Sequence, residues 1–225
     1  TFLDKSMNPV SDHSAYLVSK KAQEMHESLI VGDWHADSAL WNRDLKKTYD
    51  YGHVDIPRLQ KGNVALQMFT TVTKSPAGQN YEKNNSDSRD NITALAIVQR
   101  WPIKTWFSLY ERALYQSNKI ISLAERDPEN FMLIKSQNDL DIFLLKRKIN
   151  SRLVGGLIGT EGSHALDGSI DNIENLYKNG FRMMSLQHFF DNRLGGSLHG
   201  TSGEGLTEFG IKAIKEMMRL DIIID

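Results

Sequence analysis

Short apolar runs alternate with amphipathic or mixed segments along most of the chain. The runs that predict strands are nearly continuous in places, as is typical of parallel sheets; they lie at 29–31, 64–72, 131–134, 153–159, 183–186 and 222–225. Helices are expected at 11–27, 91–126 with a break near Pro102, 138–149, 171–178 and 206–220. This alternation predicts repeated βα units around a parallel sheet.

Two architectures fit repeated βα units: a (β/α)8 barrel and an open doubly wound sheet. Dinucleotide-binding sheets of the second kind carry a G-x-G-x-x-G pattern after a strand, and this chain has none. Ionisable residues instead follow several of the expected strands, including His35, Asp37, Glu161, His188 and Asp225. In a barrel the carboxyl ends of the strands build the active site, so these side chains are expected to converge there.

His35 and Asp37 stand two residues apart after an apolar run. On an extended backbone their side chains point to the same side, where an imidazole and a carboxylate can bind one zinc ion. Glu161 lies among small residues, with Gly159 and Gly162 nearby, and a carboxylate there can bridge two metal ions. A solvated strand end and a structural salt bridge are the alternatives.

His188 follows another strand and can donate a hydrogen bond to a developing oxyanion, or it can be a buried structural histidine. His164 and His199 are expected to be solvated loop residues, and His13 and His26 to lie on the surface of the first helix. No G-x-S-x-G pattern accompanies the serines, which argues against a serine hydrolase.

Composition narrows the choice of function. The 225 residues include 27 Lys and Arg against 28 Asp and Glu, a balance that suggests neither nucleic acid nor an anionic membrane as partner. The chain has no cysteine, which excludes thiolate zinc sites and a cysteine nucleophile within it. It also has no transmembrane segment, because no apolar run reaches the required length of about 18 residues.

Taken together, these residues resemble the renal (membrane) dipeptidase family of zinc metallopeptidases, in a bacterial-type branch. The resemblance begins near Leu29 and continues to the last residue. The segments that carry it are 33–37 (DWHAD), 53–59 (HVDIPRL), 158–164 (IGTEGSH), 185–188 (SLQH) and 205–210 (GLTEFG).

The resemblance implies a (β/α)8 barrel that binds two zinc ions. His35 and Asp37 would bind the first ion, Glu161 would bridge both, and His188 would bind the substrate and polarise the scissile carbonyl. A metal-bridging hydroxide would hydrolyse the peptide bond of a small dipeptide, in many relatives one with a D-residue at the C-terminal position. Trp34 and Ser163 stand where the family usually has glycine, so both are expected to reshape the mouth of the pocket.

The resemblance also implies further ligands beyond Asp225. Residues 1–225 would then be the N-terminal portion of a single barrel domain, its first half or somewhat more, with 1–28 as an N-terminal helical segment. Such a chain would be inactive alone. Many relatives are exported, which favours an exported protein, and homodimer formation is left open. Two other functions remain: a non-catalytic metal-binding module and another binuclear amidohydrolase, although the latter usually has H-x-H after its first strand.

Overall fold

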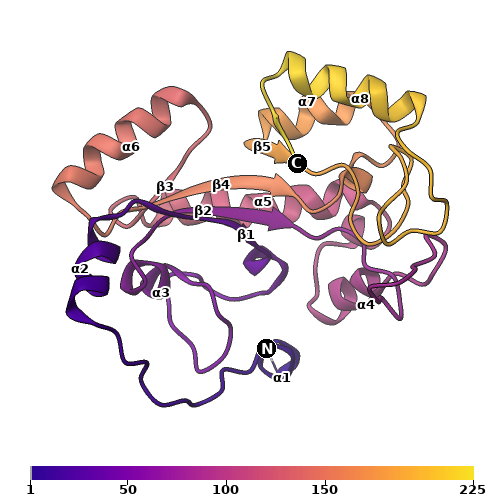
Figure 1. The fold of residues 1–225 in the computed structure, drawn as a ribbon. Helices are drawn as coiled ribbons and strands as arrows, with labels where there is room; N and C mark the ends of the chain where they lie inside the picture. The colour runs from indigo at the N-terminus through magenta and orange to yellow at the C-terminus, as the bar shows by residue number, and fades with distance from the viewer. Residues whose placement is uncertain (1) are drawn as a thin grey trace. The chain divides into compact units, whose positions relative to one another are not determined.

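The computed structural model describes residues 2–225 as an α/β fold (Figure 1). Within these residues six strands form a single sheet of order β1-β2-β4-β5-β6, with β3 paired to β4 off this path. The pairs with a defined register are all parallel. The strands are β1 Val31–Ala36, β2 Val64–Thr71, β3 Phe131–Leu133, β4 Val154–Thr160, β5 Phe181–Met184 and β6 Ile223–Ile224.

Helices connect successive strands, as the alternation in the sequence predicts. The α-helices are α1 Phe2–Met7, α2 Lys20–Ser28, α3 Ile56–Lys61, α4 Asn91–Val98, α5 Leu109–Arg126, α6 Gln137–Ile149, α7 Asp171–Lys178 and α8 Glu208–Arg219. Three 3₁₀ turns are also present in residues 2–225: η1 Ser38–Leu40, η2 Ile103–Trp106 and η3 Ser163–Leu166. The break expected near Pro102 therefore separates α4 from α5.

The chain divides into two compact units, each with its own buried residues. Unit 1 comprises the chain up to Phe69 together with Ile121–Gly156, and unit 2 comprises Thr70–Ile120 together with Leu157–Asp225. The chain passes from one unit to the other within β2 and within β4, among other places. Each unit is therefore described by itself.

The core of unit 1 is built around aromatic side chains that pack on β4. The rings of Phe69 and Phe131 meet edge to face with centroids 5.8 Å apart, and Phe143 is fully buried. A Cβ on Gly155 would come within 2.6 Å of Ile134, and one on Gly156 would collide with the Phe131 ring. The two glycines thus let this aromatic layer approach the strand directly.

The N-terminal part of unit 1 differs from the helix expected at 11–27. Helix α2 begins only at Lys20, and its N-cap Ser19 accepts a hydrogen bond at 3.2 Å from the backbone N–H of Ala22. Residues 11–19 are exposed, and the side chain of Leu17 is fully exposed. Helix nucleation is unfavourable, and a short helix is stable only when tertiary packing compensates for it. Residues 11–19 have no such packing, which explains why the helix begins only at Lys20.

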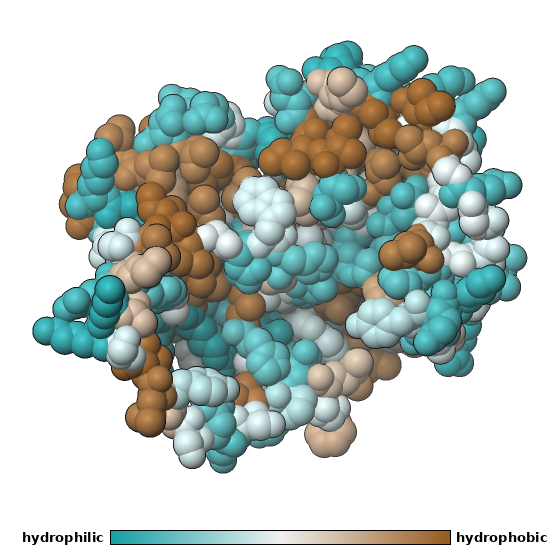
Figure 2. All heavy atoms as spheres, in the orientation of Figure 1, coloured by the Kyte–Doolittle hydropathy of each residue, from teal (hydrophilic) through white to brown (hydrophobic). Residues whose placement is uncertain are grey.

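Unit 2 places α7 and α8 side by side next to β5 and β6 (Figure 1). Strand β5 begins at Phe181, two residues earlier than the apolar run predicts, because Phe181 and Met183 are both buried. Figure 2 shows apolar side chains gathered over this region of β5 and α8. The exposed apolar residues of these last elements are Ile211, Met218, Ile223 and Ile224. Strand β6 is thus the last in the strand order, and both of its residues expose apolar side chains.

A buried arginine organises the segment between β2 and α5. Arg112 donates to the carbonyl oxygens of Thr73 and Thr105, each at 2.6 Å, and pairs with Asp90 at 2.5 Å. Asp90 also caps α4 by accepting from the backbone N–H of Ile92. Burial raises the pKa of Asp90, but hydrogen bonds from Arg112 and its other neighbours outweigh this and hold it below the usual 3.8.

Replacing Arg112 with Met is expected to lower the free energy of unfolding by about 3 kcal/mol, because the largely buried Asp90 carboxylate would lose its cation. Urea unfolding followed by circular dichroism measures this loss. The double variant Arg112→Met, Asp90→Asn is the matched control and should recover part of the stability. A loss below about 1 kcal/mol in the single variant, as expected for an exposed ion pair, would contradict the conclusion that Arg112 stabilises this segment as a buried partner of Asp90.

Candidate active site

In unit 1, β1 brings His35 and Asp37 together. The Nε2 atom of His35 lies 3.4 Å from Oδ1 of Asp37, and both side chains are partly exposed. The two side chains therefore share one side of the strand end, as their i, i+2 spacing predicts. Neither side chain is buried in the core, so both can reach a ligand in solution.

The local backbone of β1 is irregular at this point. Asp33 pairs with Gln67 and Ala36 with Phe69, so β1 uses three residues where β2 uses two. Such a bulge re-aims side chains next to functional sites. The backbone N–H of His35 donates to the Asp33 carboxylate at 3.1 Å, and the buried Gln67 donates to the Asp33 carbonyl at 3.3 Å. These contacts fix the backbone that carries His35.

In unit 2, Glu161 and His188 form the second pair of predicted site residues. Oε1 of Glu161 lies 2.6 Å from Nε2 of His188, and the Glu161 side chain is only 9% exposed. Glu161 directly follows β4, and His188 lies four residues beyond β5. A buried carboxylate beside an imidazole is a pair of groups that can bind metal and handle protons.

The turns after β4 and β5 are hydrogen-bonded to each other, and this explains the contact. The Ser185 hydroxyl accepts from the N–H of Gly162 at 2.6 Å and donates to the Thr160 carbonyl at 3.0 Å. The Ser163 hydroxyl donates to the Ser185 carbonyl at 2.7 Å. Gly162 has a φ of +83°, and a Cβ there would meet the His164 ring at 2.5 Å, so only glycine suits this turn.

His164 is buried, which corrects the expectation of a solvated loop residue. Among the contacts of residues 2–225, neither ring nitrogen of His164 has a hydrogen-bond partner. Burial, helped by the nearby positive charges of His188 and Lys74, lowers the pKa of His164 from 6.5 to about 3. His164 is therefore neutral at pH 7, because its environment in unit 2 penalises the charged imidazolium.

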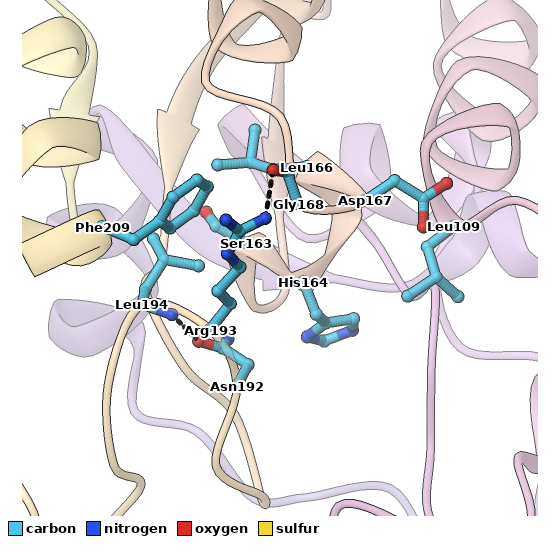
Figure 3. A pocket seen from close by; sticks show the side chains of 10 residues that line it. All are labelled: Leu109, Ser163, His164, Leu166, Asp167, Gly168, Asn192, Arg193, Leu194 and Phe209. Atoms are coloured by element: carbon cyan, nitrogen blue, oxygen red, sulfur yellow. Dashed lines mark hydrogen bonds between the residues drawn. The ribbon is translucent and has the colours of Figure 1, made fainter. Parts of the chain in front are cut away.

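The His164 ring borders a cavity of about 270 Å³ in unit 2. Figure 3 shows the ring pointing into this space, with Asn192 and Arg193 to one side and Leu109 to the other. Arg193 donates to the Gly168 carbonyl at 2.6 Å, and its guanidinium lies over the Phe209 ring. Sequence reasoning missed this cavity, because its walls come from four separate parts of the chain.

The exposure of three other histidines and of the two residues that depart from the family pattern, Trp34 and Ser163, is also defined by the structure. His13 and His26 are exposed, as expected, whereas His199 is half-buried and stacks on Phe189 with centroids 4.8 Å apart. Ser163 is fully buried and Trp34 is 44% exposed. Of these two, only Trp34 offers its side chain to solvent.

Two of the segments that resemble the dipeptidases serve folding. In 53–59, Asp55 caps α3 by accepting from the N–H of Arg58 at 2.9 Å. In 205–210, Thr207 caps α8 by accepting from the N–H of Gly210 at 3.0 Å. A Cβ on Gly210 would collide with the backbone of Leu194, which requires glycine there. These motifs therefore specify how helices begin.

Comparison with known proteins identifies the class to which this fold and these residues belong. Residues 19–225 match the profile of the membrane dipeptidase family, Peptidase family M19, and the chain belongs to that family. A curated relative, Dipeptidase verJ of Clonostachys rogersoniana, is 24% identical over 176 residues, which are 77% of this chain and 39% of that protein.

Solved structures show the same fold. The probable dipeptidase PvdM from Pseudomonas aeruginosa is 14% identical with a TM-score of 0.63, over 92% of this chain and 48% of that one. A metallo peptidase from Rhodobacter sphaeroides, liganded with a phosphinate mimic of the dipeptide L-Ala-D-Ala, is 19% identical with a TM-score of 0.60, over 88% and 58%. The chain thus spans roughly half the length of these relatives.

The comparisons confirm two expectations from the sequence. The chain has the parallel α/β fold of the M19 dipeptidases, which is of the TIM-barrel type, and it is a member of a family of metallopeptidases. Within residues 2–225, helices that combine the length and the apolar composition needed to cross a membrane are absent.

The low pKa of His164 predicts how stability depends on pH. The folded state keeps His164 neutral down to about pH 3, whereas the unfolded state takes up a proton below about 6.5. Stability should therefore fall as the pH drops below 6.5, with about 1.4 kcal/mol per pH unit coming from this residue. Replacing His164 with Phe should remove that part of the slope.

Urea unfolding of the metal-free protein at pH 6.5 and pH 5 measures the slope for the original protein and for His164→Phe. The exposed His13→Phe serves as the control and should leave the slope unchanged. An equal loss of stability in the original protein and in His164→Phe between the two pH values would show that His164 does not contribute to the slope.

Proposed function

We propose that the protein is a zinc-dependent dipeptidase. Its support is membership of the M19 family together with the presence of His35, Asp37 and Glu161, a group that offers one imidazole and two carboxylates to a metal ion. The observation that carries the proposal is that these three side chains follow or end strands β1 and β4 of one parallel sheet. The carboxyl ends of such strands hold the active sites of barrel enzymes.

The chemistry of these residues fits zinc. Imidazole nitrogen and carboxylate oxygen are both zinc ligands, and catalytic zinc sites keep a position open for water or substrate. His35 and Asp37 are partly exposed, and their contact distance of 3.4 Å leaves both groups facing the same side. In the proposed site His35 and Asp37 would hold one zinc ion, and Glu161 would be the ligand shared with a second.

Zinc ions bound there would lower the pKa of a water molecule and act as Lewis acids on the scissile carbonyl. The residues of the chain would position these ions and the substrate. Glu161 sits in a largely buried turn, where a carboxylate keeps a fixed position. The Gly162 and Ser185 hydrogen bond holds that turn against the end of β5.

His188 is proposed to orient and polarise the substrate carbonyl. Its Nε2 lies 2.6 Å from Oε1 of Glu161, so this nitrogen faces the proposed shared metal ligand. An N–H at this position can donate to the oxygen that becomes negatively charged during hydrolysis. Donors of this kind contribute about 10²- to 10³-fold to turnover.

The proposed substrate is a small dipeptide, including dipeptides with a D-residue at the C-terminal position. The support is the Rhodobacter sphaeroides relative, which was solved with a phosphinate mimic of L-Ala-D-Ala. Another binuclear amidohydrolase is the less favoured function, because those enzymes usually carry H-x-H where this chain has His35-Ala36-Asp37. A non-catalytic metal-binding module is also less favoured, because the chain carries an imidazole, His188, in contact with Glu161 in addition to the three possible metal ligands.

The proposed roles separate cleanly in mutants of the complete enzyme. Glu161→Gln should lower both the zinc content and turnover of Ala-D-Ala, because it removes a shared ligand. His188→Asn should retain zinc but lower kcat by about 10²- to 10³-fold, because only the carbonyl interaction is lost. Metal analysis and a ninhydrin assay on the same preparations make the two measurements.

Glu204→Gln is the matched control, since it changes an exposed glutamate of unit 2 and should alter neither quantity. Full zinc content and full activity in Glu161→Gln would exclude the bridging role. Equal loss of zinc in both variants would assign His188 to the metal rather than to the substrate.

A further inference from the structure

Three aromatic side chains of unit 2 form a cluster directly beside His188. The ring of Phe189 meets the His188 ring edge to face at 4.7 Å and stacks on the His199 ring at 4.8 Å with an interplanar angle of 17°. The ring of Tyr81 adjoins both, at 5.5 Å from Phe189 and 5.9 Å from His199. Tyr81, Phe189 and His199 are called the aromatic cluster below.

Hydrogen bonds hold the aromatic cluster together across 118 residues of sequence. Nδ1 of His199 lies 2.7 Å from the Tyr81 carbonyl oxygen. The backbone N–H of Asn84 donates to the His199 carbonyl at 2.8 Å, and its side-chain amide donates to the same oxygen at 3.2 Å. Asn84 is buried, so the loop after β2 is anchored to the loop after β5.

Asp191 gives the second of these loops its shape. Its carboxylate accepts from the backbone N–H groups of Ser197 at 2.7 Å, Thr201 at 2.8 Å and Ser202 at 2.8 Å. Gly200 packs directly against this carboxylate, where a Cβ would collide with it. His199 is therefore positioned by the fold before any ligand binds.

Tyr81 is nevertheless 78% exposed. Most of its ring is open to solvent although its backbone is fixed by His199. A rigid, exposed aromatic ring loses little conformational entropy when it contacts a ligand, which makes it an effective binding surface. Its neighbour Phe189 touches His188, so this surface is continuous with the residue that the proposed function assigns to the substrate.

We propose that the aromatic cluster forms a wall of the substrate site and selects dipeptides with an aromatic side chain next to the scissile bond. This inference rests on the proposed dipeptidase function and deepens it. An aromatic substrate side chain would pack against Tyr81 and the edge of Phe189, in the offset or edge-to-face geometry that aromatic pairs prefer. The two rings that would face the substrate, Tyr81 and Phe189, carry no ionic group at neutral pH, so they offer no counterion to an acidic or basic side chain.

A purely structural role makes a different prediction. If the cluster served only to join the two loops, removal of the Tyr81 ring would disturb His188 and slow every dipeptide alike. If it contacts the substrate, the loss depends on the substrate side chain. Specificity is the ratio of kcat/KM values, so this ratio separates the two roles.

The experiment uses the complete zinc-loaded enzyme with Phe-Ala, Ala-D-Phe, Ala-Ala and Ala-D-Ala. At one or both positions the original enzyme should prefer Phe over Ala by about tenfold or more. Tyr81→Ala should lower that preference by about five- to tenfold, and Tyr81→Phe should retain it. Zinc analysis and circular dichroism verify that each variant is loaded and folded.

Leu198→Ala is the matched control, because Leu198 adjoins His199 in the same loop but its side chain is 91% exposed. This variant should keep both the activity and the Phe preference. The inference is overturned if the original enzyme shows no Phe preference at either position, or if Tyr81→Ala lowers kcat/KM equally for Phe and Ala dipeptides. Failure of the zinc-loaded enzyme to hydrolyse all four dipeptides would instead reject the proposed function, and the inference with it.

Discussion

The parallel pairing of β4 with β5 is the constraint on which the candidate site of unit 2 depends. Because the two strands run in the same direction, their carboxyl ends stop at the same edge, and the turns beyond them meet. A 2.6 Å hydrogen bond from the N–H of Gly162 to the Ser185 hydroxyl then fixes the position of one turn relative to the other. Glu161 and His188 are thus neighbours because of the register between β4 and β5. The sheet would bring any two side chains at these positions close together, and here they are a carboxylate and an imidazole.

Much of the fold could be predicted from the sequence because parallel strands are apolar on both faces. The runs at 64–72 and 153–159 correspond closely to β2 and β4, and the helix break at Pro102 is present. The same reasoning failed for 11–27, where helix-like spacing exists but the structure gives the apolar side chains nothing to pack against. A helical spacing of apolar residues indicates that one face of a helix could be buried. Whether the helix forms depends on tertiary contacts that bury this face.

The candidate site was predictable only where its residues are close in sequence or follow strands. His35 and Asp37 are two residues apart, and Glu161 and His188 lie just beyond β4 and β5. The burial of His164 could not be read from its loop position, since it depends on the packing of Gly162 and Phe190 against its ring. The contact of Tyr81 with His199 had no local signal either, because it joins two irregular loops.

The two departures from the family pattern have different structural consequences. Ser163 is fully buried, and its hydroxyl donates to the Ser185 carbonyl, so a side chain in place of glycine adds a hydrogen bond between the turns after β4 and β5. It does not project into solvent, but it lines the cavity that the His164 ring borders. Trp34 is partly exposed and adjoins His35 in the bulged part of β1. A large aromatic side chain next to a proposed metal ligand can limit which substrates approach it, so Trp34 is expected to act on substrate preference from the surface, whereas Ser163 would act from within the wall of a cavity.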